Sequence, residues 1–125
     1  MVVVTDQPIV PAAVGDLIDF ANAGSVVFHY AVVKELAGTE GATTIDYRQD
    51  GDVGAELETI SADLKGKWPL EDVLLIRRTG TLGAGDVISL VAAASQNSAD
   101  AFEACQYGIG RLKKMGTIKK NEYCR

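Results

Sequence analysis

Short runs of β-branched and aromatic residues alternate with helix-patterned segments along the whole chain, and this alternation limits the folds open to it. Such residues favour strands because their side chains pack well on a pleated surface. We predict strands over residues 1–5, 25–33, 43–48, 72–78 and 86–94, and helices over residues 11–24, 52–68 and 99–114. The order β-α-β-β-α-β-β-α predicts an α+β fold, and 125 residues suit a single domain spanning residues 1–125.

The segment 99–114 has the clearest helical pattern. Its apolar residues recur at spacings of three and four and therefore share one face: Phe102, Cys105, Ile109 and Leu112. Asn97 or Ser98 can cap the start of this helix, and Gly116 ends it. Because Cys105 lies on the apolar face, we expect it to be a packing residue.

Two connections contain several glycines. Residues 34–42 have the glycine and charge content of a loop, and residues 79–86 read "TGTLGAGD". A phosphate-binding loop normally leads into a helix, whereas residues 79–86 precede a predicted strand. The pattern therefore favours a turn.

Composition argues against several classes of protein. Apolar residues make up 47% of the chain and charged residues 23%, which is typical of a globular protein. No apolar run approaches the ~18 residues of a membrane span, and residues 1–11 lack the features of a secretory signal. Cys105 and Cys124 give neither a disulfide framework nor a metal-binding spacing, which favours a cytoplasmic protein. The net charge of −5 disfavours general nucleic-acid binding.

Positive charge is concentrated at the C-terminal end. Residues 111–125 contain six of the 12 Lys and Arg residues and a single acidic residue, Glu122. Cations in a last helical turn interact favourably with the helix dipole, which explains Arg111, Lys113 and Lys114. It does not explain Lys119 and Lys120, which follow Gly116 in chain predicted to be non-helical. Neighbouring lysines lower each other's pKa and can form a pocket for a polyanion, and the pattern leaves both explanations open.

Three C-terminal stretches resemble the large, catalytic subunit of molybdopterin synthase. They are "LLIRRTGTLGAGD" (74–86), "AFEACQYGIGRLKK" (101–114) and "IKKNE" (118–122). The matching family motifs are Ile-His-Arg-x-Gly-x-Leu-x-x-Gly-Asp, a helix start Ser-x-His-Arg-x-x-Ala-Phe-Glu-Ala, and Pro-x-Trp-Lys-x-Glu. The stretch "AGSVVFHYAVVK" (23–34) is similar, more weakly, to an earlier strand of the family. The resemblance implies an α/β hammerhead fold with a mixed sheet and packed helices.

The resemblance also implies a chemistry. Members of this family add two sulfurs to cyclic pyranopterin monophosphate and so make the dithiolene of molybdopterin. The sulfur arrives as a thiocarboxylate on the Gly-Gly tail of a small ubiquitin-like partner. We therefore expect a homodimer with a sulfur carrier at each end, and no resident cofactor. Since phosphate and thiocarboxylate are both anions, the pocket needs fixed cations.

Specific residues correspond to the active site of the family. Its two catalytic lysines fall on Lys113 and Lys120, and a lysine of lowered pKa would suit proton transfer. The glutamate after the second lysine falls on Glu122, and the arginine that ends the second strand falls on Lys34. Arg78 corresponds to the arginine of the Ile-His-Arg stretch, where we expect a role nearer to structure than to chemistry. The resemblance places Glu122, Lys34 and Arg78 among the substrate-binding residues.

Other positions depart from the family. Asn97 and Ser98 stand where the family has His-Arg facing the pterin phosphate, and Lys119 replaces the tryptophan of Pro-x-Trp. We expect Lys34, Lys119 and Lys120 to hold most of the phosphate, with Asn97 and Ser98 beside it. These departures leave an alternative open, namely a non-catalytic paralogue that binds the carrier protein or a small anion. His29, in an apolar strand, is expected in the core or at an interface.

Overall fold

The computed structural model describes residues 1–35 and 43–123. Its larger sheet contains β1 (Val2–Thr5), β4 (Leu70–Arg78), β6 (Val87–Ser95) and β2 (Ser25–Val32), in that order across the sheet. β1 pairs with β4 in parallel, whereas β4 with β6 and β6 with β2 are antiparallel. The sheet is therefore mixed, and the expected α+β class is confirmed.

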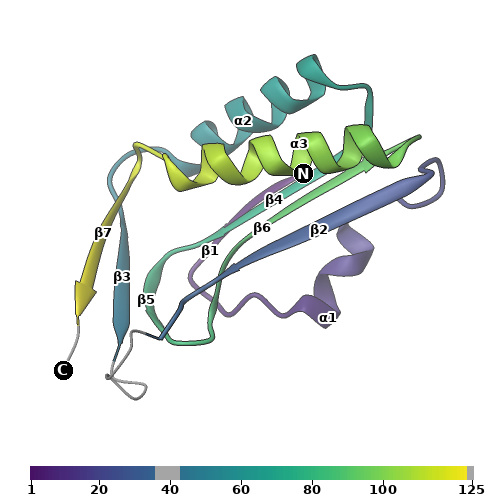
Figure 1. Cartoon of the computed structure of the whole chain (residues 1–125). Helices are drawn as coiled ribbons and strands as arrows, with labels where there is room; N and C mark the ends of the chain where they lie inside the picture. Colours follow the sequence, from purple (N-terminus) through teal and green to yellow (C-terminus); the bar gives the residue numbers. More distant parts are fainter. Residues whose placement is uncertain (36–42, 124–125) are drawn as a thin grey trace.

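Helices cover both faces of this sheet (Figure 1). α2 (Val53–Lys67) and α3 (Ser98–Lys113) lie side by side on one face, and α1 (Pro11–Val14) lies on the other. Along β4, Val73 and Leu75 pack under α2 and α3, while Leu74 and Ile76 join the cluster under α1. Because both faces are covered, β4 and β6 read as continuous apolar runs rather than as alternating ones.

A second, smaller sheet stands at one end of the molecule, at the left of Figure 1. It contains β5 (Gly80–Gly83), β3 (Thr44–Gln49) and β7 (Ile118–Tyr123), with β3 in the centre and both pairings antiparallel. Its buried face has a small core of its own, formed by Val33, Ile45, Tyr47 and Leu82. The C-terminal end of α3 leads directly into β7, so the last helix and the small sheet meet at this end.

The helix predicted over residues 11–24 is wrong in its length. Only α1 and a following 3-10 turn, η1 (Gly15–Leu17), are helical, and Ile18 is already extended with φ −123° and ψ 145°. Ile18 is buried in the core between the larger sheet and α1, and the Asp19 carboxylate accepts a hydrogen bond from the Ala21 backbone N–H. Aspartate side chains that bond nearby backbone groups in this way compete with helix formation.

Two strands were also missed. β5 lies within the predicted glycine-rich turn of residues 79–86, of which only the last part, closed by Gly85 with φ +88°, is a turn. β7 lies in chain predicted to be merely non-helical. Its partner strand β3 lies about 70 residues earlier in the chain. In this pairing, Ile118 is opposite Gln49 and Lys120 is opposite Tyr47. Most of the predicted loop at 34–42 lies outside the described residues.

The remaining sequence predictions of secondary structure are confirmed within a few residues. Asn97 is the cap of α3, since its side-chain oxygen accepts a hydrogen bond from the Asp100 backbone N–H. Cys105 is 2% exposed, and burial raises the pKa of its thiol to about 11, so it is a packing residue as expected. None of the helices in the described part of the chain is long and apolar enough to cross a membrane.

Candidate active site

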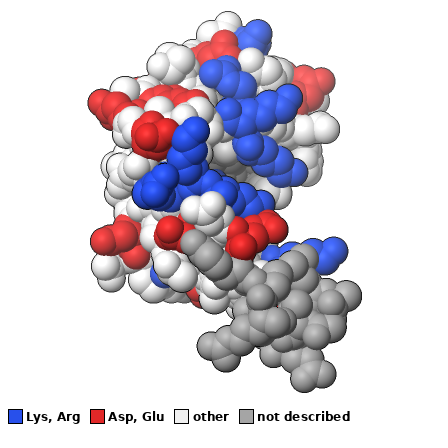
Figure 2. Space-filling view, turned by 90° about the vertical axis from the view of Figure 1, so that its left-hand side faces the viewer, with Lys and Arg blue, Asp and Glu red and all other residues white. Residues whose placement is uncertain are grey.

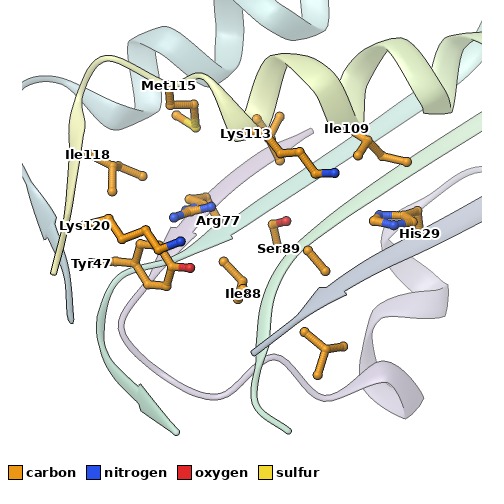
Figure 3. Close-up of a pocket in the computed structure, with 13 residues that line it drawn as sticks. His29, Tyr47, Arg77, Ile88, Ser89, Ile109, Lys113, Met115, Ile118 and Lys120 are labelled. Carbon is orange, nitrogen blue, oxygen red and sulfur yellow. The ribbon is translucent and has the colours of Figure 1, made fainter. Parts of the chain in front are cut away.

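A pocket of about 450 Å³ lies where the end of α3, the small sheet and the strands β2, β4 and β6 meet (Figure 3). Its polar lining comes from six different elements of the fold, namely β2, β3, β4, β6, α3 and β7. The thirteen lining residues are His29, Ala31, Val32, Tyr47, Arg77, Ile88, Ser89, Ile109, Leu112, Lys113, Met115, Ile118 and Lys120. Three of them are cations, so the pocket suits an anionic ligand.

Lys113 and Lys120, the two residues predicted to be catalytic, both line this pocket. Lys113 is the last residue of α3, and Lys120 is the third residue of β7. Figure 3 shows the two side chains entering the pocket from these two elements. The turn between α3 and β7 thus determines how the two ammonium groups are placed relative to each other.

Glu56 of α2 holds that turn in place. Its carboxylate accepts hydrogen bonds from the backbone N–H of Gly116 at 3.1 Å, from that of Thr117 at 3.1 Å and from the Thr117 hydroxyl at 2.6 Å. Burial acts to raise the pKa of Glu56, but these hydrogen bonds outweigh it and the pKa is lowered. The ionised carboxylate therefore links α2 to the segment that joins the two lysines.

Lys120 forms an ion pair with Glu122, the residue two positions further along β7, with 2.9 Å between Nζ and Oε1. The hydrogen bond with Glu122 raises the pKa of Lys120, and partial burial opposes it only in part. The lowered pKa expected for neighbouring lysines is therefore wrong for Lys120. Successive residues of a strand point to opposite faces, and Lys119 accordingly pairs with Asp50 at 3.5 Å.

Arg77, which the sequence interpretation passed over, is the third cation of the pocket. It is 7% exposed, and its guanidinium carbon lies 4.4 Å from the centre of the Tyr47 ring. Burial lowers the pKa of Arg77, and the interaction with Tyr47 opposes this effect. One signal was available in the sequence, because the Ile-His-Arg motif quoted above has histidine at this position.

The other predicted substrate-binding residues are not among those that line the pocket. Arg78 points away from it and pairs with Asp86 at 3.7 Å, in line with the structural role expected for it. Lys34 is exposed just after β2, and Glu122 and Lys119 occupy the positions described above. Their roles in binding stay predictions.

Asn97 and Ser98 lie at the start of α3, whereas Lys113 is at its end. With 16 residues, α3 is about 24 Å long at ~1.5 Å per residue. Figure 1 shows that the start of α3 is at the end of the molecule opposite the small sheet. Within one chain, these two residues are therefore remote from the pocket.

His29 and Ser89 add polar groups to the pocket wall. His29 is half-buried on β2 and faces the pocket opposite the small sheet (Figure 3), so it is not a fully buried core residue, and its expected place at an interface stays a prediction. Ser89, on β6, is buried and lies between His29 and Arg77 in this view. No group of three or more His, Cys, Asp or Glu residues in the described ranges could hold a metal ion.

The end of the molecule that contains the small sheet is strongly charged. Figure 2 shows Lys and Arg side chains gathered in a band across this face, with acidic side chains along its margins. The whole chain has a net charge of −5, so this distribution is uneven rather than a general basicity. Such a local positive field attracts anionic ligands to one region of the surface.

Known proteins are similar to this chain in sequence and fold. Residues 4–115 match the family model described as MoaE protein. A molybdopterin synthase catalytic subunit of Cereibacter sphaeroides is 31% identical over 102 residues, which are 82% of this chain and 69% of that protein. One of Halalkalibacterium halodurans is 28% identical over 121 residues, covering 96% of this chain and 78% of the relative.

Solved structures agree with the sequence comparisons. The crystal structure of molybdopterin synthase from Staphylococcus aureus superposes with a TM-score of 0.86 and 25% identity, covering 98% of this chain and 90% of the other. A complex of subunits 1 and 2 of molybdopterin-converting factor from Helicobacter pylori shows the same fold, with a TM-score of 0.76 and 13% identity over 99% of this chain and 85% of the other. From its sequence match and its fold, this chain belongs to the MoaE family.

Proposed function

We propose that this chain is the catalytic subunit of a molybdopterin synthase, a sulfurtransferase of molybdenum cofactor biosynthesis. Its substrate is cyclic pyranopterin monophosphate, its product is molybdopterin, and it needs no resident cofactor. The partner is a small ubiquitin-like carrier whose C-terminal Gly-Gly ends in a thiocarboxylate. Relatives 24–31% identical over most of the chain are molybdopterin synthase catalytic subunits, which supports this assignment.

The observation on which the proposal rests is the meeting of Lys113 and Lys120 in one pocket. Both the pterin phosphate and the thiocarboxylate are anions, and two ammonium groups can hold them close together against their mutual repulsion. The ion pair with Glu122 raises the pKa of Lys120, which favours its charged form, so Lys120 can serve as a positive charge and hydrogen-bond donor. Lys113 has no carboxylate partner within residues 1–35 and 43–123, and its ammonium is open to a ligand.

Sulfur transfer is the reaction that this arrangement favours. The tail of the carrier would enter the pocket with its thiocarboxylate between the two lysines. Each tail would give up one sulfur to the pterin, and its acyl carbon would take an oxygen from the pterin or from water and end as a carboxylate. An ammonium group next to the thiocarboxylate stabilises the charge that develops as sulfur leaves. We further propose that the protein works as a homodimer in the cytoplasm, with one carrier at each end.

The experiment is conversion of cyclic pyranopterin monophosphate to molybdopterin with a thiocarboxylated carrier. Lys113→Ala and Lys120→Ala should each abolish product formation, because each removes a cation of the pocket, and should leave thermal unfolding unchanged. The matched control is Lys114→Ala, since Lys114 is exposed beside Lys113 and outside the pocket; it should retain near-normal activity. Equal, modest losses in all three variants would contradict a specific role for the two lysines.

A second function is favoured by Asn97 and Ser98. Neither side chain is charged, and Asn97 is engaged as the cap of α3. A paralogue that keeps the fold but has lost sulfur transfer would use Asn97 in this structural way. Such a protein would bind the carrier or a small anion in the same assay and make no molybdopterin. Product formation by the wild-type protein would exclude it, and reduced formation would indicate a weakened synthase.

A further inference from the structure

Arg77 is a buried cation that lacks a carboxylate partner in the described part of the chain. A buried charge destabilises a protein unless a group of opposite charge or a set of hydrogen bonds compensates for it. The neighbouring Arg78 shows the usual arrangement, since it pairs with Asp86. Arg77 is 7% exposed, and its partner is the neutral side chain of Tyr47, through the aromatic ring and a side-chain hydrogen bond that acts to raise the pKa of the arginine.

The Tyr47 ring lies close to the guanidinium of Arg77. Tyr47 is itself 6% exposed and is held in the core of the small sheet, so its position is rigid. A guanidinium over an aromatic face gains a cation–π interaction, and its five N–H donors leave several available for other acceptors. Figure 3 shows that Arg77 lies at the wall of the pocket next to Lys120 and Tyr47.

The hydrogen-bond donors of Arg77 are not all used. Its Nε is buried and has no hydrogen-bond partner among residues 1–35 and 43–123; the Nε of Arg78 is likewise unpaired, but the charge of that residue is balanced by Asp86. An unsatisfied buried donor costs roughly 1–3 kcal/mol, more when the group is charged. The cost falls away when an anionic ligand occupies the pocket and accepts from the guanidinium.

The surrounding cations strengthen this argument. Arg77 acts to lower the pKa of Lys120 through charge repulsion, whereas Glu122 raises it. The positive charge of Lys120 is thus partly neutralised by its own partner, while that of Arg77 is not. With Lys113 also lining it, the pocket has more positive charge than its own side chains balance.

We propose that Arg77 is an anion-binding residue of the pocket, whose guanidinium receives the oxyanion of a ligand. The inference rests on the proposed function, and the ligand group is either the phosphate of the pterin or the carboxylate-type end of the carrier tail. Both are oxyanions that a guanidinium can bind through two parallel hydrogen bonds. Arg77 then supplies the rigid pair of parallel N–H donors that the side chains of Asn97 and Ser98 do not provide.

The test compares wild-type protein with Arg77→Met, Arg77→Lys and the control Lys114→Met. Calorimetry measures the binding of two probes: cyclic pyranopterin monophosphate, and a synthetic peptide with the C-terminal sequence of the carrier, ending in Gly-Gly carboxylate. Arg77→Met should weaken binding of one probe by about 10- to 100-fold, the range for a hydrogen bond to a charged group. Arg77→Lys keeps the positive charge but not the two parallel N–H donors of the guanidinium, so it should lose less affinity than Arg77→Met. Lys114→Met should bind both probes like wild type.

The probe that loses affinity identifies the oxyanion as phosphate or tail carboxylate. Unchanged affinity for both probes in Arg77→Met would overturn the inference, as would failure of the wild type to bind either. Thermal unfolding separates this role from a structural one, because removing an uncompensated buried charge should leave Tm unchanged or raise it. A lower Tm with normal binding would also overturn the inference. If Arg77→Met does not fold, Arg77→Lys decides, with undiminished affinity counting against the inference.

The proposed function is judged separately, by product formation in the wild-type protein. A wild type that makes molybdopterin, with Arg77 variants that bind both probes normally, would leave the function intact and refute the role of Arg77. A wild type that makes no product, but whose affinity for one probe depends on Arg77, would refute the proposed function and support the role of Arg77. The two failures are therefore distinguishable in one set of measurements.

Discussion

The ammonium of Lys120 lies 2.9 Å from the carboxylate of Glu122 on the same face of β7. The two residues are two positions apart in a strand, and such residues share a face. The pairing raises the pKa of Lys120. Glu122 therefore favours the charged form of a predicted catalytic lysine, while Lys119, the residue before Lys120, is directed to the other face and pairs with Asp50.

Replacing Glu122 by glutamine should shift the alkaline limit of activity to lower pH. Glu122→Gln removes the anion that favours protonated Lys120, so the lysine loses its proton at a lower pH than in the wild type. The measurement is the pH dependence of molybdopterin formation, supported by NMR titration of the Lys120 side chain. Asp50→Asn is the matched control, because it removes the partner of Lys119 outside the pocket. An identical pH profile in Glu122→Gln and wild type would contradict the role of the pair.

Glu56→Gln should destabilise the protein at neutral pH by about 1 kcal/mol, since hydrogen bonds to a partly exposed carboxylate are screened by solvent. The pKa of Glu56 in the folded state is below its ordinary value of 4.5. Its contribution to stability is therefore fully present above pH 4.5 and is lost as the pH falls through the folded-state pKa. Urea unfolding of Glu56→Gln should show a smaller loss of stability in that acid range than wild type.

The control for Glu56 is Glu58→Gln, which changes an exposed carboxylate on the same helix. It should leave both the stability at neutral pH and its acid dependence nearly unchanged. Equal behaviour of the Glu56 and Glu58 variants would show that the turn between α3 and β7 is held by other contacts.

The double substitution Asn97→His with Ser98→Arg tests the departures from the family motif. Because these positions are a helix length from Lys113, they can reach a pocket only on a second copy of the chain. In a homodimer we expect tighter binding of cyclic pyranopterin monophosphate, by on the order of 1–3 kcal/mol for a charge-assisted hydrogen bond. Loss of the Asn97 cap should at the same time cost about 0.5–2 kcal/mol of stability.

Calorimetry at low and high salt, with sedimentation to determine the oligomeric state, checks this prediction. The single variant Asn97→Ala is the control, since it removes the cap without adding charge. A monomer at micromolar concentration, or a dimer with unchanged affinity and salt dependence, would mean that this surface does not bind the phosphate.

Two glycines of α3 should respond oppositely to alanine. A Cβ at Gly108 would lie 2.9 Å from Cγ1 of buried Val91, whereas one at Gly110 would meet nothing within 4 Å. Gly110→Ala should stabilise the protein by about 0.5–1 kcal/mol through helix propensity. Gly108→Ala gains the same propensity but overpacks the core, so we expect a net loss of about 1 kcal/mol. Urea unfolding measures both, and a stabilised Gly108→Ala would refute the tight packing of α3 on β6.

Local patterns were sufficient to predict most of the regular elements. α3 begins where Asn97 caps it and buries the face that contains Cys105 and Leu112, because capping and hydrophobic periodicity act between residues close in the chain. The helix predicted over residues 11–24 was too long. The backbone at Ile18 is extended, and its side chain is buried between the larger sheet and α1, which the local pattern does not reveal. β7 was missed because its sequence lacks alternating apolar residues, and its pairing with β3 is distant in the chain.

Some residues of the candidate site could likewise be predicted from the sequence, whereas others are revealed only by the tertiary structure. Lys113 and Lys120 could be named from the sequence, through the resemblance of their segments to a known family. Strand alternation alone also implies that Arg77 and Arg78 point to opposite sides of β4. Only the tertiary structure decides which of the two enters the pocket, because that depends on how the small sheet places Tyr47 against β4. The physical reason is that a sequence determines the period of its side chains, whereas the packing of distant segments determines what each face meets.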